Sequence, residues 1–475
     1  MGKRIHAFRD DALGEDDATA LAQRLRNGDL RPREAIEATI KRIEAVEPEL
    51  NGVALAAWEE ALEKAPERPG DGVFAGVPSL IKDNADVQGW PTRHGSRAVV
   101  NPPPAARHGA FTRQYLAQGF TLLGKSRLPE FGFSASTEFE DAPPTRNPWD
   151  TEYSSGASSG GAAALVAAGA VPIAHANDGG GSIRIPAACC GLVGLKPTRG
   201  RFIDSEMARS LPVNIVGEGV VTRSVRDTAR FFHGAEQHYR NRRLPAVGLV
   251  EAPGRRRLRV GLVLDSINGH GTCEQTRETV LRTAGLLEEL GHHVEEMEAP
   301  VPRSFQEDFL LYWGFLSWSI STFGRRIMSP EFDPDRVDGL SKGLRAHYRR
   351  KGWRTPQMLY RFRKYRRMYE RHFVRGGQDL VLSPTLCHVT PPLGHLSPSV
   401  PYETLIERLT RYVGFTPLNN VTGSPAISLP LGRSGEGLPI GVHLSAAPGE
   451  ERMLLEVALQ LEQARPWPQI PQAAD

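Results

Sequence analysis

The sequence predicts an α/β protein with a mixed central β-sheet flanked by helices on both faces. Strand and helix signals alternate along most of the chain, which is the pattern of a sheet covered by helices. Strand signals also occur on both sides of a basic helical segment at about 303–375. We therefore expect residues 1–475 to form a single domain, with that segment as an insertion.

Helices are predicted at the N-terminus, over about 15–62. Pro32 lies near a helix start. The apolar residues after it share one helical face: Ala35, Ile36, Ile40, Ile43 and Val46. Beyond a Pro/Gly-rich loop at 65–72, Val77–Ile81 predicts a short buried strand that Lys82 follows directly. Such a lysine either extends its ammonium group to solvent or is buried, and both interpretations stay open here.

A phosphate-binding pattern overlaps the next predicted strand. Residues Gly119–Ser126 match G-x-x-x-x-G-K-[ST]. In a P-loop the residues between the two glycines form a loop, whereas Phe120–Leu123 predict a strand and Pro129 would interrupt a following helix. A nucleotide-binding protein that uses Gly119–Ser126 is therefore a weak alternative.

Two Ser/Gly clusters lie between residues 153 and 198. The first is Gly156–Gly161 (GASSGG) and the second is Asp178–Ser182 (DGGGS). A helix is predicted between them at 162–168, with Ser158 or Ser159 able to cap its start. The first cluster also matches the G-x-S-x-G elbow of α/β-hydrolases. That motif needs an apolar strand immediately before it, and residues 151–155 do not supply one.

The rest of the chain continues the alternation. Strands are expected at 171–174, 192–195, 260–264, 293–297, 380–382, 426–431 and 440–444, and helices at 276–290 and 450–462. Within the basic segment, residues 342–375 carry thirteen Lys and Arg against the single acid Glu370. The simplest interpretation is a solvated helical face; the alternatives are a helical excursion near the pocket, or a contact for a second copy or an anionic partner.

Composition excludes several classes of protein. A net charge of +3 over 475 residues does not indicate nucleic acid as a partner. The four cysteines show no metal-ligand spacing, and no apolar run approaches the ~20 residues of a membrane span. The N-terminus has no signal-peptide pattern. We expect a soluble, cytoplasmic protein without a membrane span.

The serines of the two clusters need a base, because a hydroxyl is a poor nucleophile until its proton is removed. Neither cluster contains a histidine, and His175 is expected to be structural. Lys82 is the remaining candidate. A lysine acts as a base only when neutral, and burial can lower its pKa by up to about 3–5 units. Ser158 and Ser182 can then pass a proton between that amine and the reacting atom.

Backbone groups of the second cluster supply a further element. Gly179 through Ser182 offer four successive N–H groups that can surround an oxyanion, and one such donor is typically worth about 10²–10³ in rate. A tight turn is the simpler structural interpretation of the glycines alone. Asp178 and Arg184 flank the turn, and an ion pair between them can fix it.

Several segments together match one known pattern. They are Gly76-Val77-Pro78-x-x-x-Lys82-Asp83, Arg146–Trp149, Gly156–Gly161, Asp178-x-Gly180–Pro186, Gly191–Thr198, Asn420-x-x-Gly423-x-Pro425-Ala426 and Gly437–Val442. Together with the spacing of 24 residues from Ser158 to Ser182, these segments resemble the amidase signature family of Ser–cisSer–Lys amide hydrolases. The resemblance covers most of residues 15–235 and 380–465, and leaves the basic segment outside.

The resemblance implies a role for each matching residue. Ser182 corresponds to the acyl-enzyme nucleophile, Ser158 to the bridging serine after a cis peptide bond, and Lys82 to the base. The oxyanion hole corresponds to the N–H groups of residues 179–182, Gly179, Gly180 and Gly181 among them. Ser159, Asp178 and Arg184 are expected to support the site.

Three departures from the family pattern concern substrate preference more than reaction type. Ala157 stands where the family usually has glycine, Ala176–Gly179 stands for Gly-Thr-Asp-Thr, and His443 stands for a glutamine. Residues 175–178 (HAND) resemble the branch that includes 6-aminohexanoate cyclic dimer hydrolases, which points to lactam or aliphatic amide substrates.

The resemblance implies an amidase that hydrolyses a small-molecule carboxylic amide of aliphatic, aryl or lactam type, with no metal or cofactor. The oligomeric state is open, with a homodimer as one option. Two further alternatives are a glutamine-hydrolysing subunit of an amidotransferase complex and a catalytically silent binding protein.

Overall fold

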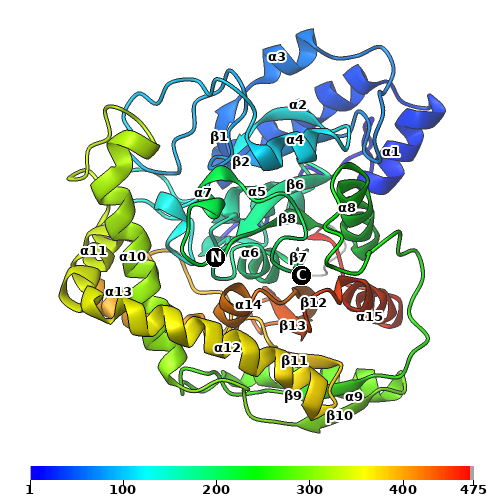
Figure 1. Cartoon of the computed structure of the whole chain (residues 1–475). Coiled ribbons are helices and arrows are strands. Elements are labelled where there is room, and N and C mark those ends of the chain that lie inside the picture. Colours follow the sequence, from blue (N-terminus) through cyan, green and yellow to red (C-terminus); the bar gives the residue numbers. More distant parts are fainter. Residues whose placement is uncertain (1, 471–475) are drawn as a thin grey trace.

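The computed structural model describes residues 2–470 and confirms the predicted fold class (Figure 1). The strands are β1 Val53–Ala56, β2 Pro78–Lys82, β3 Thr121–Ser126, β4 Arg146–Asn147, β5 Asp150–Ser154, β6 Ile173–Asp178, β7 Val193–Lys196, β8 Gly217–Thr222, β9 Arg259–Leu262, β10 His293–Glu296, β11 Leu380–Pro384, β12 Ala426–Arg433 and β13 Pro439–Ala446. The α-helices are α1 Ala18–Asn27, α2 Pro32–Leu50, α3 Trp58–Glu63, α4 Ala110–Leu116, α5 Gly160–Ala167, α6 Arg184–Cys190, α7 Glu206–Arg209, α8 Val225–His238, α9 Glu274–Glu289, α10 Ser304–Ile327, α11 Gly339–Lys351, α12 Thr355–Gly376, α13 Tyr402–Tyr412, α14 Pro417–Thr422 and α15 Glu451–Ala464. Two short 3₁₀ helices are η1 Glu130–Gly132 and η2 Gly352–Arg354.

One 11-stranded sheet organises the chain, in the order β1-β3-β2-β6-β8-β7-β12-β13-β11-β9-β10. The sheet is mixed. Strand β2 runs parallel to both β3 and β6, and β9 runs parallel to β10 and β11. In the middle of the sheet the neighbouring strands are antiparallel, in the spatial order β6, β8, β7, β12, β13. Strands from before and after the basic segment therefore join the same sheet, and β2 and β6 lie side by side.

Both faces of the sheet are covered by helices. Neighbouring residues of a strand point to opposite faces, and in β6 Ile173 belongs to one hydrophobic core and Ala174 to the other. The core that includes Ile173 is built with α1, α8, α9 and α15, and the core that includes Ala174 with α2, α5 and α6. The site described below lies at strand ends between these two layers.

The N-terminal region differs from expectation in one element, whereas the phosphate-binding pattern forms a strand, as expected. Within about 15–62 the structure has helices α1, α2 and α3, but also the edge strand β1, which pairs antiparallel with β3. The β3 strand runs through Gly124–Ser126, so this stretch is not a phosphate loop. Lys125 is buried; its Nζ donates to the Pro91 carbonyl at 2.7 Å and lies 3.3 Å from Asp83 Oδ1.

The elbow motif also needs a correction. A strand, β5, does precede Gly156–Gly160, where none was expected. It pairs with β4 in a separate two-stranded sheet and not in the central sheet. The geometry of a nucleophile elbow at the end of a central strand is therefore absent from this part of the described chain.

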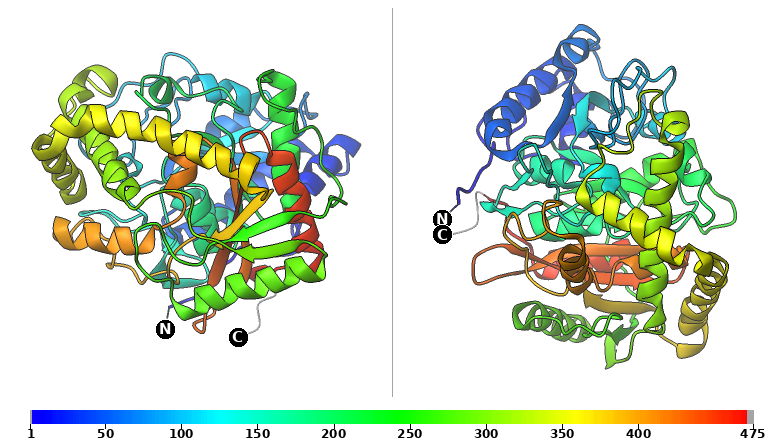
Figure 2. Two further views of the ribbon diagram at one scale, coloured as in Figure 1. Left: turned by 60° about the horizontal axis from the view of Figure 1, so that its bottom comes forward. Right: turned by 90° about the vertical axis from the view of Figure 1, so that its left-hand side faces the viewer.

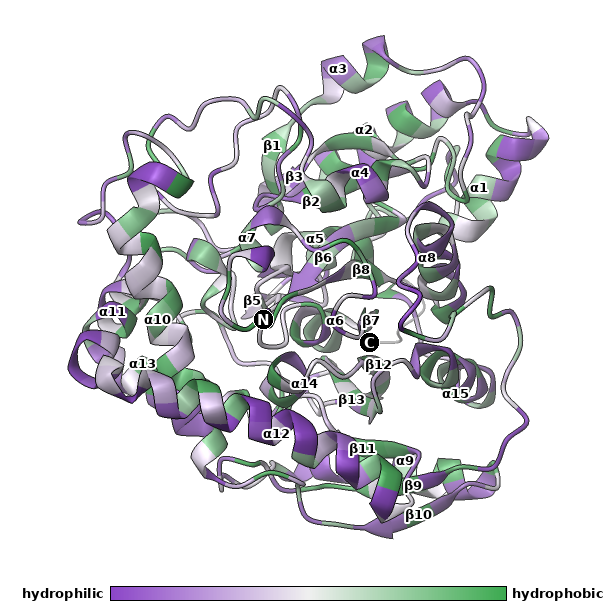
Figure 3. Cartoon of the chain, in the orientation of Figure 1, coloured by the Kyte–Doolittle hydropathy of each residue, from purple (hydrophilic) through white to green (hydrophobic). Residues whose placement is uncertain are grey.

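The basic segment is helical as predicted, and forms α10, α11 and α12. In α12 the buried residues are Met358, Phe362, Tyr365, Tyr369 and Phe373, at helical spacing, and the outer face is strongly hydrophilic (Figure 3). The helix lies across α14 at the surface of the molecule (Figures 1 and 2). The excursion near the pocket is also correct, because α10 borders the site. Among the described helices none combines the length and apolarity needed to cross a bilayer.

Candidate active site

Lys82 ends β2 in the middle of the sheet, and its side chain is fully buried. Its Nζ lies 2.7 Å from Ser158 Oγ, 2.8 Å from Asn177 Oδ1 and 3.0 Å from Ser159 Oγ. Burial lowers the pKa of Lys82 to about 7, although the negative charges of Glu218 and Asp178 act in the opposite direction. A large fraction of the Lys82 amine groups is therefore neutral near pH 7.

The partners of Lys82 orient its amine. Asn177 Nδ2 donates to Asn84 Oδ1 at 3.1 Å, so the side-chain oxygen of Asn177, Oδ1, faces the lysine as an acceptor. Ser159 Oγ donates to the backbone carbonyl of Asn177 at 3.4 Å and also accepts from the lysine. A neutral amine has two N–H donors and one lone pair. When Asn177 and Ser159 accept from both of these donors, the lone pair of a neutral amine is left to accept from the Ser158 hydroxyl.

Ser158 and Ser159 precede α5, and the peptide bond between Ala157 and Ser158 is cis, as the resemblance implies. The capping role expected for these serines is wrong. Ser159 occupies the N-cap position but makes no side-chain capping bond, because its hydroxyl is engaged by Lys82 and Asn177.

His175 is structural, as expected. It lies within β6 and is fully buried. Its Nδ1 accepts from the Lys82 backbone N–H at 3.1 Å and its Nε2 faces Glu218 Oε2 at 3.1 Å. Burial lowers the pKa of His175, against the influence of Glu218. A neutral ring with both nitrogens engaged holds β2 against β6 and is not available as a base for either serine.

Ser182 lies at the end of the glycine turn that joins β6 to α6, and Asp178 holds that turn. The Asp178 carboxylate accepts from Gly181 N at 2.7 Å, Ile183 N at 3.1 Å and Arg184 Nε at 2.9 Å. The predicted Asp178–Arg184 ion pair is confirmed, and both side chains are fully buried. Burial opposes ionisation, but Arg184 keeps the pKa of Asp178 well below its usual range.

The expected set of oxyanion donors is corrected by one member. The N–H of Gly181 donates to Asp178 and is not available. Across residues 2–470 the structure records no acceptor for the N–H groups of Gly179, Gly180 and Ser182. Gly181 has a different role. Its φ of +134° and its close approach to Thr416 and Ile185 leave no room for a Cβ, so the turn requires glycine there.

Residues far along the chain complete the turn. Thr416 Oγ1 donates to the Gly180 carbonyl at 2.7 Å, and Asn420 Nδ2 donates to Asp178 Oδ1 at 2.8 Å. His443, one of the departures from the family pattern, is also buried here. Its Nε2 lies 3.0 Å from Arg184 Nη1. Burial and the charge of Arg184 keep the pKa of His443 well below its usual value, so its neutral Nε2 accepts from the guanidinium.

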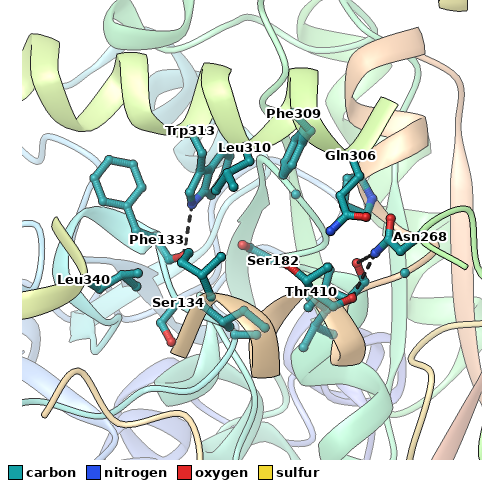
Figure 4. Close-up of a pocket in the computed structure, with 18 of the residues that line it drawn as sticks. Phe133, Ser134, Ser182, Asn268, Gln306, Phe309, Leu310, Trp313, Leu340 and Thr410 are labelled. Carbon is teal, nitrogen blue, oxygen red and sulfur yellow. Dashed lines mark hydrogen bonds between the residues drawn. The ribbon is translucent and has the colours of Figure 1, made fainter. Parts of the chain in front are cut away.

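Ser158 and Ser182 border one cavity together, although no hydrogen bond joins their hydroxyls in the described structure. Ser182 also borders a second cavity (Figure 4). In that view its hydroxyl lies between Leu340 and Phe133 on one side and Gln306 and Asn268 on the other. The structure thus joins Lys82 to Ser158 directly, and places Ser182 where the two cavities meet.

Sequence reasoning missed several residues of this site. Asn84 lies two residues after Lys82, and Asn177 directly precedes Asp178, yet neither was assigned a role. Asn420 is in a matching segment without an assigned role. Thr416 and Trp313 lie in stretches that match no motif, and only the three-dimensional arrangement identifies them.

Comparison with known proteins is consistent with this geometry. The Amidase family model matches residues 34–455. The chain is 51% identical over 469 residues to the putative amidase AmiC of Mycobacterium tuberculosis (strain ATCC 25618 / H37Rv), with 98% of each chain covered. It is 37% identical over 474 residues to the 6-aminohexanoate-cyclic-dimer hydrolase of Pseudomonas sp. (strain NK87), with 95% of each covered.

A solved structure is similar over nearly the whole chain. It is a 6-aminohexanoate cyclic dimer hydrolase complexed with substrate, with a TM-score of 0.85 and 33% identity, over 96% of this chain and 99% of that one. The predicted resemblance, including the proximity to these hydrolases, is confirmed. The chain therefore belongs to the amidase family and is an amide hydrolase.

Proposed function

We propose that the enzyme cleaves its amide through an acyl-enzyme on Ser182, with Ser158 as relay and Lys82 as base. The observation that carries this proposal is the fully buried Lys82 amine, whose Nζ lies 2.7 Å from Ser158 Oγ. Asn177 and Ser159 act as positioning residues, because they engage the two N–H groups of the amine.

The first half of the reaction forms an ester. The Ser182 hydroxyl gives its proton to Ser158, which gives its own to Lys82, while Ser182 Oγ attacks the amide carbon. The negative oxygen of the tetrahedral intermediate accepts hydrogen bonds from the free N–H groups of the turn, at Gly179, Gly180 and Ser182. The proton then returns from Lys82 through Ser158 to the amide nitrogen. The C–N bond breaks, and the amine leaves.

The second half releases the acid. A water molecule takes the place of the amine beside Ser158 and loses a proton through Ser158 to Lys82 as its oxygen attacks the ester carbon. The bond to Ser182 Oγ breaks, and the relay returns the proton to that oxygen. Apart from the substrate and this water, the groups named in these steps are residues of this chain.

We propose small aliphatic, aryl or lactam-type amides as substrates, and not glutamine as in the amidotransferase alternative. Glutamine carries an α-ammonium and an α-carboxylate, which a specific pocket must pair with charged side chains. The cavity beside Ser182 that Figure 4 shows has no charged residue in its lining. This favours a neutral acyl group.

The proposal is tested with the Ser182→Ala and Lys82→Ala variants against a panel of amides and esters, together with a fluorophosphonate probe on the wild-type enzyme. We expect the wild type to label at Ser182 and both variants to lose turnover. Wild-type turnover in both variants would refute it. The cytoplasmic location, the single domain and the homodimer stay predictions from the sequence.

A further inference from the structure

Ser182 lies where two cavities of different chemistry meet. Gly132, Phe133, Ser182 and Trp313 border both. The first, called here the Gln306 cavity, has a volume of about 110 Å³ and is also bordered by Gln306, Asn268, Phe309, Leu310, Leu340 and Thr410. The second, called the Phe323 cavity, has a volume of about 560 Å³ and is also bordered by Ser158, Asn177, Met207, Phe323, Arg326 and Ile327.

Trp313 and Phe133 border both cavities and contact each other. Trp313 Nε1 donates to the Phe133 carbonyl at 3.0 Å, and the two rings meet edge to face with centroids 5.6 Å apart (Figure 4). A substrate whose carbonyl carbon reaches Ser182, which also borders both cavities, can therefore place the two sides of its amide bond in different cavities.

The position of Ser158 decides which side lies where. Of the two cavities, Ser158 borders the Phe323 cavity and not the Gln306 cavity. In the proposed mechanism Ser158 returns the proton to the leaving nitrogen, so that nitrogen must lie on the Ser158 side. The acyl chain then extends into the Gln306 cavity.

The Gln306 cavity combines apolar walls with one polar end. Phe309, Leu310 and Leu340 supply apolar surface, whereas Gln306 and Asn268 lie together at one side of the view in Figure 4. Asn268 Nδ2 already donates to the Thr410 carbonyl at 2.9 Å. The half-buried amide of Gln306 has no hydrogen-bond partner within the described part of the chain. A ligand that supplies this partner displaces water from the amide, without breaking a hydrogen bond within the protein.

The rim of the Phe323 cavity is apolar and exposed. Met207, Phe323 and Ile327 are 40%, 48% and 52% exposed and lie at its border. Arg326 is the charged residue in that lining. Such a rim suits an apolar substituent on the leaving nitrogen and disfavours a cationic one.

We propose that the substrate is an N-substituted amide with an uncharged, mainly apolar acyl chain whose far end carries a neutral hydrogen-bonding group for Gln306. Its apolar amine lies in the Phe323 cavity. This assignment rests on the proposed function, because the role of Ser158 sets the orientation. Gln306 is then a residue that determines acyl specificity.

The first experiment tests Gln306. Two series of anilides, from butanoyl to octanoyl, are compared at equal length: one with a methyl end and one with an acetamido end. At the best length we expect the wild type to prefer the acetamido end by about three- to tenfold in kcat/KM, the effect of one neutral hydrogen bond. Gln306→Leu should abolish this preference. Gln306→Glu, of nearly equal size, should shift the preference to an ammonium end. An unchanged preference in Gln306→Leu overturns the assignment.

The second experiment tests the orientation with a matched pair of variants. Thr410 borders the Gln306 cavity and Ser319 the Phe323 cavity; both are half-buried helical residues. Thr410→Phe should lower kcat/KM for long acyl chains relative to acetyl, at constant amine. Ser319→Phe should lower it for large amines relative to small ones, at constant acyl group. The opposite pattern would show that the orientation is reversed.

The chemistry of Ser182 provides a separate readout. Fluorophosphonate labelling and acetanilide hydrolysis do not depend on the far end of the acyl chain. If Ser182→Ala retains turnover, the proposed function fails and the substrate assignment fails with it. If Ser182 chemistry is intact but the acyl preferences do not respond to Gln306 and Thr410, the substrate assignment alone is wrong.

Discussion

The amine of Lys82 lies 2.7 Å from the hydroxyl of Ser158, and no carboxylate of the described chain lies within ion-pair distance of it. A buried lysine without a counter-ion is costly to keep charged. Its neutral form is favoured, and this form can accept a proton from a serine. The geometry and the energetics of this one contact therefore agree with the role of a base.

Loss of either serine should abolish turnover. We expect Ser182→Ala and Ser158→Ala each to lower kcat for an anilide by about 10³ or more, because residues that act as one unit fail together. The control is Ser79→Ala, which removes a buried serine of β2 whose hydroxyl contacts Tyr115 at 2.6 Å and not the site. Comparable losses in all three variants would indicate general damage to the fold and contradict the assignment.

The pH profile should report the base. Below pH about 7 the Lys82 amine is protonated and cannot accept a proton, and above it the amine is neutral. Because only the neutral amine acts as a base, kcat/KM should rise with pH and then level off. Burial lowers the pKa of Lys82, which places this acid limb near pH 7. Initial rates from pH 5 to 9 measure this limb. A flat profile over this range would exclude a titrating lysine as the base.

A new charge beside Lys82 should move that limb. The Asn177→Asp variant places a carboxylate where an amide oxygen now lies 2.8 Å from Nζ. A neighbouring anion stabilises the ammonium form, so the pKa of Lys82 should rise and the limb should move upward by about one unit or more. Asn27→Asp makes the same charge change on the exposed end of α1 and should leave the limb in place. Equal shifts in both variants would argue against direct contact.

The Asp178–Arg184 pair should matter more to stability than an exposed pair does. We expect Asp178→Ala to lower the free energy of unfolding by about 3–5 kcal/mol, because it leaves the Arg184 guanidinium buried and unpaired. Denaturant unfolding at pH 7 measures the loss. Glu37→Ala, which breaks the exposed pair with Arg33, should have no comparable effect. Similar results for the two variants would contradict this account.

Gly132 should be sensitive to a single added methyl group. A Cβ there would lie 2.9 Å from Ser158 Oγ, so Gly132→Ala should displace the relay and lower kcat at least about tenfold. The control is Gly28→Ala, at a similar positive φ (+81° against +74°) with no neighbouring atom within 4 Å. It carries the same backbone strain without the contact. If both variants lose kcat to the same extent, backbone strain and not displacement of Ser158 is the cause of the loss.

The sequence identifies Lys82 and Ser158, which the structure brings together, because the signal for each is local. Lys82 follows an apolar strand, and the spacing of Ser158 and Ser182 lies within one stretch of chain. What surrounds Lys82 is not local, since Asn177 reaches it only because β2 and β6 pair across about ninety residues. The edge strand β1 was missed for the same reason, because its pairing with β3 is not visible in its own sequence.

Backbone conformation is a second reason why the sequence alone does not predict the whole site. Four consecutive N–H groups look equivalent in sequence, and only the φ of Gly181 and the position of Asp178 remove one of them from the set. The part of the site that α10 supplies is a third feature that the sequence alone does not predict. The aromatic residues of α10 follow the ordinary pattern of an amphipathic helix, and nothing in that pattern distinguishes the Trp313 that borders both cavities from those that only fill the core.

The contacts of the glycine turn also bear on how the enzyme is made. Its carbonyl and carboxylate groups are held by Thr416 and Asn420, and its arginine by His443. During synthesis, Lys82, Ser158 and Ser182 leave the ribosome long before these residues do. The turn can reach its final form only when the residues that hold it have been added. We therefore expect a nascent chain to be inactive until its C-terminal part docks.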